Sequence, residues 1–531
     1  MKKVTLLNHH CVVLMSLALL SFSTSAISQT SAGKKLYQTH CQSCHGTERL
    51  GAMGPALLPE NLSRLRKPKA KKVINNGRAA TQMPSFKDKL SSDEVAQLID
   101  YIYTPTKAAL NWGINDIKNS HIAHFDQSKL GNKPVFDADL MNLFIVVELG
   151  DHSATLLNGD TFDPIDRFKT RFALHGGPKY SPDGRYVYFA SRDGWISKYD
   201  IYNLKTVVEV RAAINTRNIA ISNDGQYLIV GNYLPNNVVI LNTSDLSPVK
   251  VIEAVGKDGV SSRVSAVYNA PPRYSFIVAL KDVKEVWEIP YSDKGGVEVY
   301  KGWAHDYRKD GGEGKLENWK VEDAFPIRRI ETDDFVTDFF FDPDYINLIG
   351  TARNNHNGQV INLDTKKKVA SIALTGMPHL GSGITWDYQG KEIFASPNIK
   401  EGKVTVIDME NWQVIKEIKT QGPGFFMRSH NNSPYAWADV FFGPNKEKVH
   451  IIDKSTLEIV KTIAPSPGKN AAHVEFTKDG KYVLLSVWDE DGELIIYDAN
   501  SLEIVKRMPM KKPSGKYNVY NKTHYERGTS H

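Results

Sequence analysis

The sequence has little cysteine and no long apolar run after its N-terminal segment. Three cysteines occur in 531 residues. Cys11 lies in the N-terminal apolar run, so Cys41 and Cys44 are the only pair left for a disulfide. No later stretch is apolar enough to span a bilayer. No basic stripe carries interleaved aromatic residues, which excludes a nucleic-acid-binding surface. The net charge of +6 suits an encounter with acidic partners or carboxylate-rich ligands.

Residues 1–28 have the three-part pattern of a secretory signal. Lys2 and Lys3 precede the apolar run "CVVLMSLALL", and small residues follow at 26–28. We therefore expect a signal peptide over residues 1–28 and a periplasmic mature protein. An uncleaved membrane anchor is the alternative, but the apolar core is short and ends in Ser/Thr-rich sequence.

The stretch "QTHCQSCHGTERLGAMGP" places two thiols and an imidazole at the spacing that attaches a c-type haem. Cys41 and Cys44 would form the thioether bonds, and His45 would be the proximal iron ligand. Pro55 is well placed to pack against that imidazole. A thioredoxin-like redox pair and a chance match are the alternatives, but neither explains the sequence that follows.

That following sequence, "TQMPSFKDKLSSDEVAQLIDYIY", predicts a sixth haem ligand and a covering helix. Met83 is the favoured ligand, and Met53, in a Gly-rich turn, is its competitor. A helix capped by Ser91 or Ser92 would close over the porphyrin with its apolar face. That face consists of Val95, Leu98, Ile99 and Ile102. Residues 29–105 thus predict a small all-α cytochrome c domain, and a His/Met haem has a raised potential suited to receiving electrons.

Residues 106–140 are polar, lack periodicity and contain Pro134, so we expect a linker draped over a surface. His121 and His124 lie in this segment. They are either surface histidines or exchangeable ligands that enter a haem pocket.

The remaining residues, 141–531, change character to short strands separated by Asn/Asp-Gly turns. Repeated units include "YSPDGRYVYFASRDGWISKYD", "AISNDGQYLIVGNYLPNNVVILN" and "EFTKDGKYVLLSVWDEDGELIIYD". An all-strand repeat of roughly 40 to 50 residues indicates a β-propeller. The length allows seven to nine blades, and we predict eight. The fold class is therefore mainly β, with a central channel that would hold a cofactor or substrate.

Four histidines are predicted to precede the inner strand of a blade and to face that channel. These are His175, His379, His430 and His473. Each alone reads more simply as a structural histidine, but the recurring placement favours a shared pocket.

These features together resemble the cytochrome cd1 nitrite reductase family, over nearly the whole mature chain. Its members join a cytochrome c domain to an eight-bladed propeller that holds haem d1. The segment "ALHGGPKYSPDG" resembles the blade whose histidine binds the haem d1 iron from the proximal side, which implies this role for His175. The segment "MPHLGSG" resembles the distal histidine loop, which implies that role for His379.

Within the family, the residues favour one branch. The reductases present two distal histidines as proton donors, but the segment where the second should lie, residues 269–274, has none. By contrast, "GPGFFMRSHNNSPYAW", "AAHVEFTKDG" and "PSGKYNVYNKTHYERGTSH" resemble the dihydro-haem d1 dehydrogenase branch of haem d1 biosynthesis. Such an enzyme oxidises a propionate of dihydro-haem d1 to the acrylate of haem d1.

The resemblance implies roles for three further residues. His473 would be the base, since a neutral imidazole is poised near the working pH. Tyr517 would position the side chain or assist proton transfer, and Arg428 would bind a tetrapyrrole carboxylate. Each has a structural alternative: Tyr517 as core packing, Arg428 as a blade-to-blade salt bridge, and His430 in place of His473.

Two other functions stay open at this point: a nitrite reductase with an altered pocket, and a non-catalytic carrier that delivers haem d1 to a reductase. In the dehydrogenase reading, electrons would pass from the tetrapyrrole to the haem on Cys41 and Cys44. A periplasmic electron acceptor would then receive them.

Overall fold

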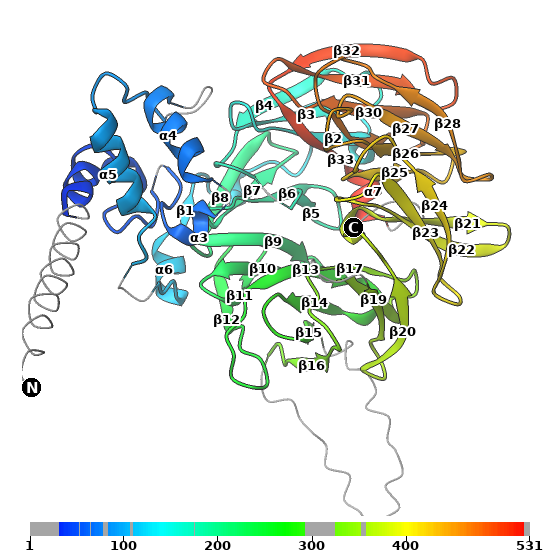
Figure 1. Ribbon diagram of the computed structural model, residues 1–531, viewed down its shortest axis with the longest axis horizontal. Helices are drawn as coiled ribbons and strands as arrows, with labels where there is room; N and C mark the ends of the chain where they lie inside the picture. The colour runs from blue at the N-terminus through cyan, green and yellow to red at the C-terminus, as the bar shows by residue number, and fades with distance from the viewer. Residues whose placement is uncertain are drawn as a thin grey trace, which may run out of the picture. The chain divides into compact units, whose positions relative to one another are not determined.

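The computed structural model describes residues 31–52, 54–63, 65–77, 83–106, 110–174, 176–292, 324–351 and 357–524. The predicted signal peptide, Met53 and His175 lie outside these residues. The chain divides into two compact units, Met1–Asn111 and Trp112–His531. The first unit is helical and the second is built of strands, as Figure 1 shows.

The helical unit is a small bundle around one apolar core. Residues 31–40 are helical. The helices that follow are α2 (Gln42–His45), α3 (Pro59–Leu62), α4 (Lys67–Asn76) and α5 (Ser92–Ile102). Helix α5 confirms the predicted capped helix: Ser91 accepts a hydrogen bond from the Glu94 backbone and Glu94 reciprocates. The predicted apolar face, Val95, Leu98, Ile99 and Ile102, is buried in the core.

The second unit is an eight-bladed β-propeller, which confirms the predicted fold class. Its described residues form eight antiparallel sheets. The innermost strands of successive blades contact one another, as β9 with β13 and β29 with β33.

From the centre outward, the first four blades contain the following strands. Blade I has β33 (Pro513–Asn518), β2 (Leu143–Glu148), β3 (Ser153–Asn158) and β4 (Pro164–Lys169); blade II has β5 (Lys179–Tyr180), β6 (Tyr186–Ala190), β7 (Trp195–Asp200), β8 (Lys205–Arg211) and β1 (Ile122–Ala123); blade III has β9 (Asn215–Ile221), β10 (Tyr227–Leu234), β11 (Asn237–Asn242) and β12 (Pro248–Glu253); blade IV has β13 (Val264–Ala270), β14 (Ser275–Leu280), β15 (Glu285–Pro290) and β16 (Arg328–Glu331).

The other four blades contain four strands each. Blade V has β17 (Asp338–Phe341), β18 (Asn347–Thr351), β19 (Asn357–Asn362) and β20 (Lys367–Ala373); blade VI has β21 (Ile384–Tyr388), β22 (Lys391–Pro397), β23 (Lys403–Asp408) and β24 (Gln413–Lys419); blade VII has β25 (Met427–Ser429), β26 (Tyr435–Asp439), β27 (Val449–Asp453) and β28 (Glu458–Ile463); blade VIII has β29 (Ala471–Phe476), β30 (Tyr482–Val487), β31 (Gly492–Asp498) and β32 (Ile504–Met510).

The ring closes by pairing the two ends of this unit. Strand β33 is the inner strand of blade I, where it pairs with β2 so that Tyr517 lies opposite Ile145. Helix α7 (Val519–Thr523) follows directly. Because β33 follows the strands of all the other blades in sequence, blade I needs residues from both ends of this unit.

A repeated turn joins the first two strands of several blades. In "SPDG", the Asp183 carboxylate accepts a hydrogen bond from the Ser181 hydroxyl and another from the Arg185 N–H. Gly184 has a positive φ of 72°, which glycine adopts without strain. The same pattern recurs around Asp224 and Asp479. These bonds explain why the repeat could be read from the sequence.

Residues 112–142 pack onto the propeller as α6 (Ile114–Asn119), β1, η1 (Gln127–Lys129) and η2 (Leu140–Asn142). Strand β1 pairs with β8 and extends blade II. His121 Nε2 lies 2.6 Å from the Asp245 carbonyl oxygen, and His124 Nε2 lies 3.0 Å from a Glu209 carboxylate oxygen. Both histidines therefore hold this segment on the propeller.

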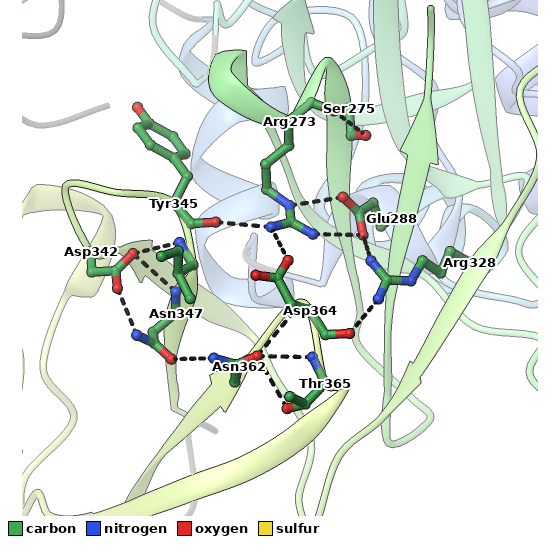
Figure 2. A network of polar contacts seen from close by, with 11 residues as sticks. Arg273, Ser275, Glu288, Arg328, Asp342, Tyr345, Asn347, Asn362, Asp364 and Thr365 are labelled. Atoms are coloured by element: carbon green, nitrogen blue, oxygen red, sulfur yellow. Dashed lines mark hydrogen bonds and ion pairs between the residues drawn. The ribbon is translucent and has the colours of Figure 1, made fainter. Parts of the chain in front are cut away.

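An ion network joins blades IV and V, as Figure 2 shows. Glu288 is fully buried and accepts hydrogen bonds from Arg273 (2.8 Å) and Arg328 (2.6 Å). Arg273 also donates to Asp364 (2.7 Å), and Arg328 donates to the Asp364 carbonyl (2.7 Å). The turn η3 (Pro271–Arg273) therefore directs Arg273 between the blades.

Candidate functional site

The helical unit holds two thiols and a histidine in the arrangement that a c-type haem needs. Cys41 and Cys44 are free thiols on either side of the start of α2. His45 is buried, and its Nδ1 donates to the Pro55 carbonyl at 2.7 Å. This bond fixes the tautomer that leaves Nε2 available to a metal. Burial also lowers the pKa of His45, which favours the neutral, ligating form.

Two further features fit a haem beside His45. A Cβ on Gly54 would lie 2.8 Å from His45 Cε1, so only glycine leaves room for the ring. Met83 packs on the core of the unit. Its role as sixth ligand stays a prediction.

In the propeller, His379 lies just before η5 (Leu380–Ser382) and β21, as predicted. Its Nδ1 donates to the Phe425 carbonyl at 2.7 Å, and its Nε2 lies 3.9 Å from Asp338 Oδ2. Burial lowers the pKa of His379, although Asp338 opposes this shift. The Nδ1 bond leaves Nε2 with a lone pair, which can bind iron or accept a proton.

His473 lies within β29 rather than before it, which corrects the expected placement. The strand bulges there, between Ala472 and Val474, and His473 has a positive φ of 56°. Its side chain is buried, and within the described part of the chain its Nδ1 has no hydrogen-bond partner. Burial, and then the cations Lys516, Arg428 and Lys522, hold the pKa of His473 well below its usual value. The imidazole is therefore neutral, the form in which a histidine can act as a base.

Tyr517 of β33 lies beside His473, with ring centroids 5.1 Å apart. Burial raises the pKa of its hydroxyl to about 12, so the phenol stays protonated. Two glycines leave room for its ring. A Cβ on Gly177 would lie 2.8 Å from Tyr517 Cε1, and one on Gly515 would lie 2.6 Å from its hydroxyl. The fold thus brings Tyr517 and His473 together.

Arg428 of β25 is buried in the same region. Its Nη1 donates to the Met427 carbonyl at 2.9 Å. Its Nε lies 3.9 Å from Glu475 Oε2 of the next blade, which is too far for a hydrogen bond. Burial lowers the pKa of Arg428. The predicted alternative, a blade-to-blade contact, is thus present but weak, and Nε stays without a hydrogen-bond partner among the described residues.

Three lysines surround Arg428, and sequence reasoning missed all of them. Lys516 is fully buried and donates to Ser486 Oγ at 2.8 Å. Lys522 Nζ lies 3.8 Å from Glu475 Oε2. Burial lowers the lysine pKa values: to about 8 for Lys179, to about 7 for Lys522 and well below the usual range for Lys516.

We call His379, Arg428, His473, Lys516, Tyr517 and Lys522 the central site. Among the described residues, the carboxylates of Glu475 and Asp439 are the ones that raise the pKa values of the buried Arg428 and Lys516. A bound carboxylate would add negative charge beside these cations and raise the pKa values of the lysines. The central site therefore suits a ligand that carries carboxylate groups.

Aromatic rings lie between the two histidines of the central site. The Phe425 ring lies 4.0 Å from His379, the Phe426 ring lies 4.6 Å from His473, and the two phenylalanines are 4.6 Å apart. A half-buried cluster continues through Phe441 to Trp488. Such flat apolar faces suit stacking against a conjugated ring system.

His430 does not belong to the central site, which corrects the expectation that it precedes an inner strand. It follows β25, in the turn to β26. Its Nε2 donates to the Lys478 carbonyl at 3.2 Å, and its Nδ1 accepts from the Asn432 N–H at 3.1 Å. His430 therefore connects the turns of blades VII and VIII and is not positioned to replace His473.

Two other predicted positions have different outcomes. His175 lies outside the described residues, so its role stays a prediction; nearby Gly177 lies against Tyr517. Residues 269–274 end β13 and form η3, where Arg273 contacts Glu288 and not a central-site histidine. Tyr268 of β13 interacts with Asp338, the carboxylate that lies 3.9 Å from His379 Nε2.

The chain thus combines a c-type cytochrome unit with an eight-bladed propeller whose centre holds histidines, cations and aromatic rings. It belongs to the cytochrome D1 heme domain family, whose model matches residues 138–317 and 307–522. Residues 28–102 match the family of the cbb3-type cytochrome c oxidase subunit III. The resemblance to haem d1 proteins is confirmed. Among the described residues, no helix has the length and apolarity to cross a membrane.

Similar proteins span nearly the whole chain. The dihydro-heme d1 dehydrogenase of Pseudomonas aeruginosa is 53% identical over 94% of this chain and 96% of its own. A nitrite reductase of Stutzerimonas stutzeri is 26% identical over 93% of each chain. A solved structure of dihydro-heme d1 dehydrogenase NirN in complex with DHE has a TM-score of 0.86 and 53% identity, and covers 93% of this chain and 100% of that one.

Proposed function

We propose that this chain is a dihydro-haem d1 dehydrogenase. It binds dihydro-haem d1 in the propeller and oxidises one propionate side chain to an acrylate. The observation that carries this proposal is the neutral His473 beside Tyr517, next to the buried cations Arg428 and Lys516. The similarity to a dehydrogenase over almost the full length of both chains supports it.

The reaction converts a –CH2–CH2–COO⁻ side chain to –CH=CH–COO⁻ and releases two protons and two electrons. His473 accepts one proton from the saturated carbon pair, and the second proton is released to water. Tyr517, whose phenol stays protonated, positions the side chain. Arg428, assisted by Lys516 and Lys522, binds a tetrapyrrole carboxylate and favours one orientation of the substrate. His175 and His379 hold the substrate's iron.

The two electrons leave through the cytochrome c unit. Cys41 and Cys44 would hold haem c covalently, and His45 and Met83 would bind its iron. A haem held there would supply one-electron transfer from the tetrapyrrole to an external acceptor. The arrangement at His45, with Nδ1 bonded to Pro55 and Nε2 free for iron, supports this assignment.

The location and partners follow from the sequence. The signal pattern in residues 1–28 supports export to the periplasm. The net charge of +6 favours an acidic electron acceptor. A nitrite reductase that uses haem d1 would be the recipient of the product.

The first test is anaerobic mixing of the haem c protein with dihydro-haem d1, followed by oxidation, extraction and mass analysis. We expect the tetrapyrrole to lose two hydrogens. His473→Ala should reduce this conversion by about 10²–10⁴-fold, the usual contribution of a general base. His430→Ala is the matched control, because His430 is equally buried but outside the central site.

An unchanged tetrapyrrole with the unmodified protein would contradict the proposal. A nitrite-turnover assay on the same complex would then separate the two alternatives. Turnover with retained haem d1 indicates a nitrite reductase, and binding without turnover indicates a carrier.

A further inference from the structure

Asp439 connects the two histidines of the central site. It is the last residue of β26 and is almost fully buried. Its Oδ1 accepts hydrogen bonds from the N–H groups of Phe425 (2.7 Å) and Phe426 (3.0 Å). Its Oδ2 accepts one from the His473 N–H (3.3 Å). One carboxylate therefore holds backbone from two blades.

The hydrogen bonds from Phe425 and Phe426 connect Asp439 to His379. The Phe425 carbonyl accepts the His379 Nδ1 hydrogen at 2.7 Å, and the Phe425 ring lies 4.0 Å from the imidazole. The N–H of Asp439 donates in turn to the Phe426 carbonyl at 3.2 Å. Asp439 thus holds the Phe425–Phe426 segment from both sides, and this segment fixes the orientation of His379.

The third hydrogen bond connects Asp439 to the backbone of His473. This residue has a φ of 56°, in the left-handed region that a residue with a Cβ seldom occupies. The bulge at His473 interrupts the ladder with β30, so its N–H pairs with Asp439 instead. A backbone rotation here would move the imidazole away from Tyr517.

We propose that Asp439 is a positioning residue that sets the orientation of both His379 and His473 toward the tetrapyrrole. This inference rests on the proposed function. Asp439 acts through the Phe425–Phe426 segment and the His473 backbone, without contact to the reacting carbons. No motif in the sequence indicated this role for Asp439.

Asp439→Asn tests this role with little change in volume. An amide has one acceptor oxygen, so it cannot accept from both the Phe425–Phe426 pair and His473. The control is Asp408→Asn in blade VI. Asp408 is also fully buried and accepts two backbone hydrogen bonds, from Glu410 and Asn411, but it ends β23, the third strand from the centre of its blade.

Two readouts are measured on each full-length haem c protein. We expect Asp439→Asn to lower kcat for dihydro-haem d1 by about tenfold to hundredfold, because misplacing a base by about 1 Å has this effect. We also expect shifted absorption and EPR spectra of bound ferric haem d1, which report the iron ligand His379. Asp408→Asn should keep the wild-type kcat and spectra even where it lowers the thermal midpoint.

Wild-type kcat or wild-type spectra in Asp439→Asn would overturn the inference, as would equal changes in both variants. If the wild type does not convert dihydro-haem d1, the proposed function fails, and the spectra alone decide the role of Asp439. If Asp439→Asn does not fold, Asp439→Glu gives the same test, since it keeps the charge but displaces the oxygens.

Discussion

At the scale of single residues, glycines decide where the proposed catalytic groups lie. Gly54 leaves room for the His45 ring, and Gly177 and Gly515 leave room for Tyr517. A methyl group at any of these positions would overlap the neighbouring side chain. The position of Tyr517 beside His473 therefore depends on the absence of side chains as much as on the contacts present.

We predict that Gly177→Ala lowers the dehydrogenation rate by about tenfold or more, because the new Cβ would displace the Tyr517 ring. Gly259→Ala is the control. Both glycines have positive φ values, 71° and 81°, but a Cβ on Gly259 meets no atom within 4 Å. Both variants should lose about 1 kcal/mol of stability through backbone strain. Mass analysis of the product checks the rate, and equal rates in both variants would contradict the prediction.

At the scale of elements, the sequence predicted the helix ends and turns that are stabilised by hydrogen bonds between residues close together in the chain. The capping box of α5 and the Ser-x-Asp-Gly turns of the blades are complete within a few residues of sequence, so both could be read directly. The positions of the histidines relative to the strands could not be read from the sequence. His473 lies in a bulge of β29 and His430 in a turn after β25, because pairing with the neighbouring strand sets where each strand begins.

Strand β27 carries a buried histidine that should make the propeller sensitive to acid. His450 Nε2 accepts the Gln421 N–H at 3.0 Å, and its Nδ1 donates to Thr462 Oγ1 at 2.8 Å. Burial, and then Lys448, lower the pKa of His450 to about 4. In the unfolded chain the His450 imidazole binds a proton near pH 6.5. The stabilisation that neutral, buried His450 provides is therefore complete above that pH. It is lost as the pH falls from about 6.5 to about 4.

The loss should amount to about 2–3 kcal/mol between these pH values. Urea unfolding at a series of pH values measures it. His450→Gln should flatten the dependence in this window by about that amount. A variant with the wild-type slope would show that another group causes the acid sensitivity.

At the scale of the whole molecule, contacts between distant residues hold the ring together. Blade I contains both the first long strands and the last strand, and blades IV and V share the network around Glu288. A fully buried carboxylate with two arginine partners is costly to break, since removing its charge leaves both cations poorly paired.

We predict that Glu288→Gln lowers the stability of the propeller by about 3–5 kcal/mol. Asp333→Asn is the control, because Asp333 pairs with Lys368 at 2.8 Å on the surface and should contribute less than about 1 kcal/mol. Thermal unfolding followed by circular dichroism compares the two variants. Similar midpoints would contradict the view that the buried network joins the blades.

The sequence by itself determined the features that are local or repeated. Cys41, Cys44 and His45 lie within five residues, and the repeat period allows seven to nine blades, with the predicted eight confirmed by the structure. Only the tertiary structure decided which residues surround His473. Tyr517 and Lys516 reach it through closure of the ring by β33, and Asp439 reaches it from blade VII. Such contacts leave no periodic signal, because they join residues that are far apart in the chain and meet only when all eight blades close.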